Sequence, residues 1–415
     1  MSHGRPARRD MLRRALAAAL ATPFLAHAQE RPVRVLSHRY PALEYYTDQM
    51  RGAVPGVQVD VQLIPFDKML ELARIALSAR SDGIDVLYTT DVTVLDFARR
   101  GWLRPLDDLW ARFRDEFALG DFADNVVKAF TVDGHIYVIP HGVTVMLLFL
   151  RRDLLYAADL PIPRSIAQYR DLAHALNTPG RSGTVSCLKL TDAVLNEAHW
   201  YLNALGDGWF DADWQPSFAT ARGIAAIEML RDVTHAAQPS FTVAGNDECT
   251  LTLQQDLAAS GLQWVTRARA MDDPKSSRVV GQMEWIAPPQ GGSRLSSDGY
   301  AISAFSRQNP ETLFRIIAHS ASEPVMRGAA SLVVPPRRSL VTDPALADSS
   351  RSWRAAIASL GQSVPFPALA DFYAVGDGIA RRIQDAVTGQ MTVSAAMTLA
   401  ADETAAWLRQ HRDQR

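Results

Sequence analysis

The sequence predicts an α/β fold with more than one domain. Its 415 residues are enough for two or three domains of roughly 150 residues each. Apolar residues make up 47% of the chain and charged residues 21%, as is usual for a soluble globular protein. Between residues 33 and 100, short apolar segments alternate with amphipathic ones in the order strand, helix, strand, helix. This order is typical of a mostly parallel sheet covered by helices.

The first elements follow one another closely along the chain. The pattern predicts strands at residues 33–36, 56–63 and 84–88. It predicts helices at residues 44–51 and 68–79, and a third helix that begins near Asp91 as its N-cap.

Polar loops follow each of the predicted strands. In parallel sheets, ligands bind beyond the carboxyl ends of the strands. We therefore expect the three loops to lie at one edge of the sheet and to form part of a binding site, although each loop alone also fits plain solvated surface. The candidate residues are His38, Arg39, Tyr40, Phe66, Asp67, Thr90 and Asp91.

Residues 131–155 contain the most apolar part of the chain. Asp133-Gly134 favours a tight turn. Two apolar runs follow, at 136–139 and 143–150, and Pro140-His141-Gly142 separates them. This pattern predicts two buried strands, which either form a hairpin within one domain or carry the chain from one sheet into another.

The N-terminus has the pattern of an export signal. Five arginines precede the short apolar segment 15–24, and Ala26-His27-Ala28 has the form of a cleavage site. Residues 7–13 are similar to a twin-arginine signal, and both this route and the general export route fit. We expect residues 1–28 to be a signal peptide.

Several function classes have no support in the sequence. Lysine and arginine number 43 against 45 aspartate and glutamate, so no basic field indicates nucleic acid binding. No apolar run reaches the roughly 20 residues of a membrane-spanning helix. No metal-binding motif or cofactor motif occurs, and we expect neither a metal nor a cofactor. Cys187 and Cys249 fit either a disulfide or two separate buried thiols.

Several blocks follow one another in order along the chain, at residues 84–88 with 101–109, then 132–140 with 150–155, 305–327 and 334–339. These blocks resemble the extracellular solute-binding proteins of family 1, the sugar-type binding components of ABC importers that include the maltose-binding proteins. The segment 163–165 lacks the tryptophan that is usual in the family. Each block alone is weak evidence, but their order and spacing extend over about 300 residues.

The resemblance implies a two-lobe periplasmic binding protein fold of type II, in which hinge strands join two α/β lobes. Lobe one would comprise residues 31–140 and 298–337, and lobe two residues 141–297 and 338–415. It further implies a monomeric periplasmic protein, which captures a sugar or polyol between the lobes and delivers it to the permease subunits of an ABC transporter. It implies no enzymatic activity.

The same resemblance indicates candidate residues in the second lobe and in the segments that pass between the lobes. Sugar sites combine flat aromatic rings with polar hydrogen-bonding partners. The candidates are His141, Trp200, Trp209, Trp264, Arg267, Asp298, Gly299, Tyr300 and Arg338. A neutral ligand is expected, but Arg39, Arg267 and Arg338 also fit a charged ligand such as a phosphate ester. The tryptophans also fit core positions, and Asp298 also fits a turn. If Asp298 accepts hydrogen bonds from ligand hydroxyls while Gly299 allows close approach of the backbone, a small polyol or monosaccharide is favoured over an oligosaccharide.

Two other readings remain open at this point. A binding protein of this kind can serve a sensor or a periplasmic enzyme in place of a transporter. A secreted carbohydrate-active hydrolase is the alternative of a different class, but no nucleophile elbow or marked acid–base pair occurs.

Overall fold

The computed structural model describes residues 31–348, 350–370 and 372–411, so the signal peptide predicted at 1–28 lies outside the described residues. The strands are β1 Val33–His38, β2 Val59–Ile64, β3 Val86–Thr90, β4 Thr131–Val132, β5 His135–Ile136, β6 Val138–Arg151, β7 Ser260–Trp264, β8 Met283–Ile286 and β9 Leu295–Ile302. The α-helices are α2 Pro41–Met50, α3 Phe66–Ser78, α4 Thr93–Arg99, α5 Asp107–Arg112, α6 Asp124–Ala129, α7 Arg152–Ala157, α8 Ile166–Leu176, α9 Asp192–Ala204, α10 Ala221–Thr234, α11 Asn246–Gln254, α12 Pro310–Ser320, α13 Glu323–Ala329, α14 Arg338–Val341, α15 Trp353–Leu360, α16 Phe372–Val387 and α17 Val393–Gln410.

The first three long strands pair in parallel, as the sequence predicts, within a seven-stranded sheet whose other pairings are antiparallel. β1 lies in the middle and pairs in parallel with both β2 and β3. The strand β9, about 200 residues further along the chain, pairs antiparallel with β3. Helix α2 begins at Pro41, three residues before the predicted start. Proline is well suited to this position because the first turn of a helix leaves its N–H groups without helical partners.

A short hairpin precedes the long strand β6. Asp133 and Gly134 join β4 to β5, and both have positive φ angles, of 49° and 88°. Two central residues with positive φ are characteristic of the turn that best matches the twist of a hairpin. The tight turn predicted at Asp133-Gly134 is therefore confirmed.

Strand β6 is continuous, so the predicted break at Pro140-His141-Gly142 is wrong. All its residues from Val138 to Arg151 are buried, and the pairing with β9 only shifts register between Pro140 and Gly142. A proline within a strand is accommodated at such an irregularity because the ladder is already interrupted there.

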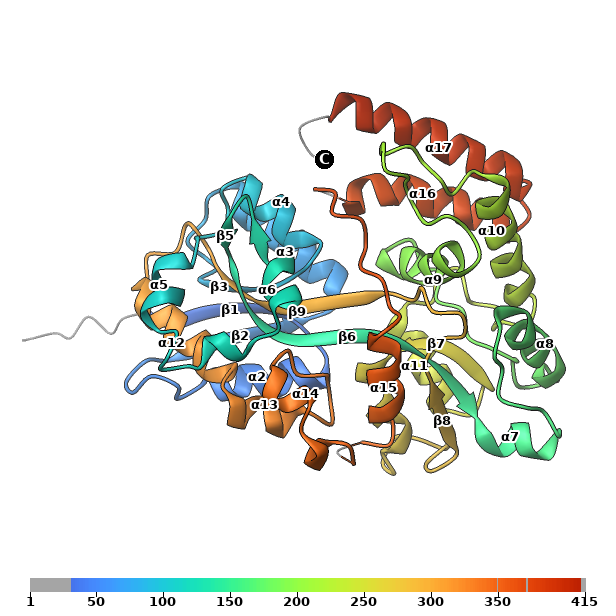
Figure 1. Ribbon diagram of the computed structural model, residues 1–415, viewed down its shortest axis with the longest axis horizontal. Helices are drawn as coiled ribbons and strands as arrows, with labels where there is room; N and C mark the ends of the chain where they lie inside the picture. Colours follow the sequence, from blue (N-terminus) through green and yellow to red (C-terminus); the bar gives the residue numbers. More distant parts are fainter. Residues whose placement is uncertain (1–30, 349, 371, 412–415) are drawn as a thin grey trace, which may run out of the picture. The chain divides into compact units, whose positions relative to one another are not determined.

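The same strand takes part in two sets of pairings, and Figure 1 shows it running beside β9. Residues 138–145 pair with β9, whereas residues 146–151 pair with β7 and β8. The chain thus passes along β6 from one group of strands to another, and the single-sheet hairpin is not what forms.

The hydrophobic core has two parts, and β6 contributes to both. Leu147 and Phe149 pack in the first cluster, which covers β1, β3 and β9. Leu148 and Leu150 pack in the second, with α8, α9, α10, α16 and α17. The alternation follows from the two-residue period of a strand, whose successive side chains point to opposite faces. Within the described part of the chain, no helix combines the length and apolar character needed to cross a membrane.

Candidate functional site

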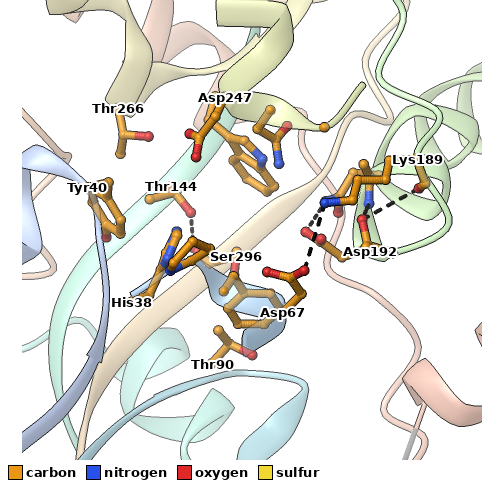
Figure 2. Close-up of a pocket in the computed structure, with 18 of the residues that line it drawn as sticks. His38, Tyr40, Asp67, Thr90, Thr144, Lys189, Asp192, Asp247, Thr266 and Ser296 are labelled. Carbon is orange, nitrogen blue, oxygen red and sulfur yellow. Dashed lines mark hydrogen bonds and ion pairs between the residues drawn. The ribbon is translucent and has the colours of Figure 1, made fainter. Parts of the chain in front are cut away.

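A pocket of about 270 Å³ opens between the ends of β1 and β3 and the beginnings of α9 and α11 (Figure 2). The structure brings eight of the sequence-predicted residues to its wall. These are His38, Tyr40, Phe66, Asp67, Thr90, Trp264, Arg267 and Asp298. The three loops after β1, β2 and β3 therefore meet at one place, as the parallel order of those strands requires.

Aromatic rings form one side of the pocket. The ring centroid of His38 lies 5.3 Å from that of Tyr40, 5.7 Å from that of Phe66 and 5.9 Å from that of Tyr88. Burial, reinforced by the charge of Arg267, lowers the pKa of His38 to about 3. His38 is therefore neutral at physiological pH, and its ring offers a hydrogen-bonding group without a charge.

Asp298 lies at the base of the pocket and is almost fully buried. The hydroxyl of Tyr40 donates to its Oδ2 atom at 2.7 Å, and the hydroxyl of Tyr88 also donates to this carboxylate. Burial raises the pKa of Asp298 to about 6, while the two tyrosine hydroxyls act in the opposite direction. Asp298 is thus an ionised acceptor at neutral pH and loses that charge in mildly acidic solution.

Asp91, a predicted site residue, does not line the pocket but contacts two residues that do. Nη2 of Arg294 donates to both its carboxylate oxygens, at 2.9 and 3.0 Å, and the hydroxyl of Ser296 donates to Oδ1 at 3.0 Å. The guanidinium group of Arg294 also lies 4.2 Å from the ring centroid of Phe366. Asp91 therefore holds the pocket-lining Arg294 and Ser296 in place.

The opposite wall comes from α9, α11 and the segments before them. Thr191 caps α9 by accepting from the N–H of Ala193, and Asp192 accepts from the amide of Asn196 at 2.9 Å. Burial raises the pKa of Asp192. At the start of α11, the carboxylate of Glu248 accepts from the N–H of Gly245 at 2.9 Å.

The cationic side chains that line the pocket each lie close to a carboxylate. Lys189 is 3.8 Å from Asp67 across the pocket, as the dashed line in Figure 2 marks. Arg267 is 2.8 Å from Asp247, and Arg294 is paired with Asp91. Lys68 is 2.9 Å from Glu71 on its own helix. Each of these four cations thus has an acidic partner within 4 Å, an arrangement that favours a neutral ligand with many hydroxyl groups.

Two of the predicted tryptophans belong to the core. Trp200 is completely buried, and its Nε1 donates to the carbonyl of Pro289 at 3.2 Å. Trp209 donates to Nδ1 of His199 at 2.8 Å. Both rings belong to the second core cluster, both indole N–H groups have an acceptor, and neither ring lines the pocket.

Other predicted residues take part in contacts within or beside the first sheet. His141 bonds to Ser320 at 2.8 Å, and the hydroxyl of Tyr300 bonds to that of Ser37 at 2.7 Å. A Cβ atom at Gly299 would lie 2.4 Å from the carbonyl oxygen of Ile139, so this glycine allows two strands to approach, where approach of a ligand was expected.

Two predicted arginines also lie away from the pocket wall. Arg338 is exposed and donates to Asp124 at 3.1 Å. Arg39 is exposed beside the pocket residue His38 but is not part of its wall.

Sequence reasoning missed about two thirds of the pocket wall. The missed residues are Pro65, Lys68, Tyr88, Thr144, Lys189, Thr191, Asp192, Ala193, Asn196, Gly245, Asn246, Asp247, Glu248, Thr266, Arg294, Ser296 and Tyr373. Thr144 is a polar residue in the middle of an apolar strand, which is a signal that could have found it. Thr191-Asp192 has the pattern of a helix N-cap, but nothing in the sequence indicates that this helix end faces the others.

Metal ligation has no support among residues 31–348, 350–370 and 372–411, because no group of three or more suitable histidine, cysteine or acidic side chains gathers there. The pocket instead combines hydroxyls, carboxylates, amides and aromatic rings. Such a wall can bind a polyhydroxylated solute through hydrogen bonds and ring contacts.

Comparisons with known proteins agree with this chemistry. A sequence model of the bacterial extracellular solute-binding proteins matches residues 38–323. The mannitol-binding protein of Pseudomonas aeruginosa is 22% identical over 434 aligned positions, which cover 95% of this chain and 97% of that protein.

Solved structures match the fold over nearly the whole chain. An ABC transporter solute-binding protein from Agrobacterium vitis, with bound D-mannitol, has a TM-score of 0.80 at 20% identity and covers 91% of this chain and 98% of its own. Maltose-bound MalE3 from T. maritima has a TM-score of 0.79 at 21% identity and covers 90% of this chain and 100% of its own. These likenesses confirm the predicted α/β fold of type II, with hinge strands between two lobes.

Proposed function

Because this chain belongs to the bacterial extracellular solute-binding proteins, we propose that it captures a neutral sugar or polyol in the pocket and delivers it to the permease of an ABC importer. Several relatives support this class, since one is a mannitol-binding protein and solved structures hold ribitol, D-mannitol and maltose. The proposal includes export to the periplasm by the N-terminal signal, a monomeric state and no catalytic step.

One observation of the pocket carries the ligand class. Lys68, Lys189, Arg267 and Arg294 each lie within 4 Å of a carboxylate. Asp298 accepts from the hydroxyls of Tyr40 and Ser296, and no described cation forms an ion pair with it. A phosphate or carboxylate on the ligand would therefore compete with a carboxylate that already lies beside each of these cations, and its approach to the buried carboxylate of Asp298 would cost free energy.

The size of the pocket limits the ligand further. A volume of about 270 Å³ is at the lower end of the range for small-molecule sites. We therefore favour a linear polyol or a monosaccharide over an oligosaccharide.

A ligand panel tests the proposal. Purified protein is titrated by calorimetry with mannitol, sorbitol, ribitol, glucose, maltose, mannitol 1-phosphate and gluconate, and each mixture is analysed for product. We expect tight binding to one or more neutral small compounds and no conversion. Binding to the phosphate or the acid alone would contradict the ligand class, and release of a product would contradict the absence of catalysis.

A further inference from the structure

Two thiols lie directly behind the pocket wall and have no part in the proposed binding. Cys187 and Cys249 are both free and both buried, with exposed fractions of 3% and 0%. Cys187 precedes the pocket residue Lys189 by two positions, and Cys249 immediately follows the pocket residue Glu248. The two cysteines therefore lie next to two separate segments of the pocket wall along the chain.

The side chains around the thiols join these segments into one cluster. Cys249 is close enough to Cys187 to contribute, after burial, to the raised pKa of that thiol. The amide of Gln263 donates to Sγ of Cys187 at 2.8 Å, and its carbonyl oxygen accepts from the hydroxyl of Thr250 at 3.3 Å. On the other side, Gln238 contacts Sγ of Cys249 at 3.7 Å and donates to the carbonyl of Ser186 at 2.9 Å.

The backbone holds the cluster close to β7. Val185 forms an isolated bridge with Gly261, and a Cβ atom at Gly261 would lie 2.2 Å from Cγ2 of Val185. Helix α11, which carries Cys249, packs against the same strand. The segment before Cys187 and the helix of Cys249 thus share β7 as their support, so the contact of the thiols is fixed by secondary structure and not only by two flexible side chains.

We propose that Cys187 and Cys249 form an intramolecular disulfide in the exported protein and that this bond fastens the start of α11 to segment 187–191. In this step the two thiols lose two protons and two electrons, and one S–S bond forms. A disulfide oxidant, such as oxidised glutathione or an oxidised thiol–disulfide oxidoreductase, accepts the electrons and protons and becomes two thiols. Compartments outside the cytoplasm supply such oxidants.

The timing of the reaction follows from the burial of the thiols. Burial raises the pKa of Cys187, so its thiol is protonated and little nucleophilic once the chain has folded. We therefore expect the bond to form before folding buries the two thiols. Once formed, it limits the separation of two wall segments that contribute Lys189 and Thr191 on one side and Gly245 to Glu248 on the other.

Thiol counting tests the bond without reference to any ligand. The full chain is recovered from the periplasm, and also refolded in a glutathione redox buffer, then denatured and treated with a maleimide. We expect no labelled thiol, an intact mass lower by two hydrogen atoms than that of the reduced chain, and one peptide pair linked through Cys187 and Cys249. Two labelled thiols in both preparations would overturn the proposal, and so would a disulfide that links two molecules.

Thermal unfolding tests the fastening of the wall. The oxidised wild-type protein should melt roughly 4 °C or more above the reduced protein, because the bond restricts the unfolded chain. Cys187→Ser and Cys249→Ser serve as matched controls, whose melting temperatures should not respond to reductant. If oxidised and reduced wild-type protein melt at the same temperature, the bond does not stabilise this region. A failure of the ligand panel would leave both measurements unaffected.

Discussion

At the scale of single residues, Asp298 combines a role in the pocket with a role in stability. The sequence suggests a ligand acceptor or a turn residue, and the structure places it within β9 and at the base of the pocket. Its carboxylate accepts from the hydroxyls of Tyr40 and Tyr88, so it also satisfies two buried groups. Its removal by alanine would leave these hydroxyls unpaired and reduce stability as well as binding. Asparagine, which keeps an acceptor oxygen, is therefore the more informative substitution.

We predict that ligand affinity depends on pH through Asp298. Its pKa of about 6 means that the carboxylate is ionised at pH 7.5 and largely protonated at pH 5. Ligand hydroxyls donate more strongly to the ionised form, so affinity should fall as the pH is lowered through about 6. Asp298→Asn should bind about tenfold more weakly at pH 7.5 and show little dependence on pH. Calorimetry with the ligand found in the panel measures both effects.

The control for this prediction is Asp192→Asn, since burial also raises the pKa of Asp192 in the same pocket. This variant should retain the fall in affinity near pH 6. If the pH dependence persists in Asp298→Asn and disappears in Asp192→Asn, then Asp192 causes it and the prediction for Asp298 is wrong.

The raised pKa of Asp298 acts in the opposite direction on the stability of the protein without ligand: affinity is expected to rise with pH, whereas stability falls. The folded state keeps a proton on Asp298 that the unfolded state releases above its ordinary pKa of 3.8. This contribution to stability is therefore present below about pH 4 and is lost as the pH rises through about 6.

At the scale of elements, the pairing of β6 with β9 decides how the two sets of strands connect. The two strands pair from Val138 to Val145, and Gly299 lies opposite Pro140 in this ladder. Gly299 is required there because of the neighbouring backbone, since a Cβ atom would meet the carbonyl of Ile139. The ladder thus depends on a residue without a side chain at its point of irregular register.

We predict that Gly299→Ala lowers the free energy of unfolding by roughly 1–3 kcal/mol or more, because backbone atoms 2.4 Å away cannot yield easily. Urea unfolding followed by circular dichroism measures the change. Gly378→Ala is the matched control, because its Cβ atom would meet nothing closer than 4.0 Å within α16. That variant should be as stable as the wild type or slightly more stable. Normal stability of Gly299→Ala with weak ligand binding would instead favour a direct role in the pocket.

At the scale of the whole molecule, the pocket draws its wall from segments that belong to both core clusters. Tyr40 and Tyr88 are part of the first cluster, and Phe66 packs against it. Trp264 and Tyr373 pack against the second cluster. A ligand that contacts both groups would hold them together, and β6 and β9 provide the continuous connections about which they can move.

We predict that ligand binding reduces the radius of gyration, as measured by small-angle scattering at saturating ligand. The ion pair between Lys189 and Asp67 crosses the pocket, but both side chains are partly exposed, so the pair contributes only about 0–1 kcal/mol. Lys189→Ala should therefore still become more compact with ligand. An unchanged radius in the wild type would contradict closure, and a loss of compaction only in Lys189→Ala would assign closure to the ion pair.

The sequence by itself determined the features that depend on near neighbours. The alternation of strands and helices predicts the parallel order of β1, β2 and β3, and parallel order brings the loops at His38, Phe66 and Thr90 to one edge. Asp133-Gly134 determines a hairpin because few residues adopt positive φ. The ordered blocks between residues 84 and 339 determine the family, because they preserve spacing along the chain.

The tertiary structure decided which of several similar side chains line the pocket. Trp200, Trp209 and Trp264 are alike in the sequence, yet only Trp264 lines the pocket, because the rings of the other two are buried in the second cluster. Arg294 contacts Asp91 across about 200 residues, and Gln263 of β7 links Cys187 to Thr250 of α11. Such contacts arise from the packing of distant elements, for which a local pattern has no signal, since hydrophobic burial is not directional and fixes only which faces turn inward.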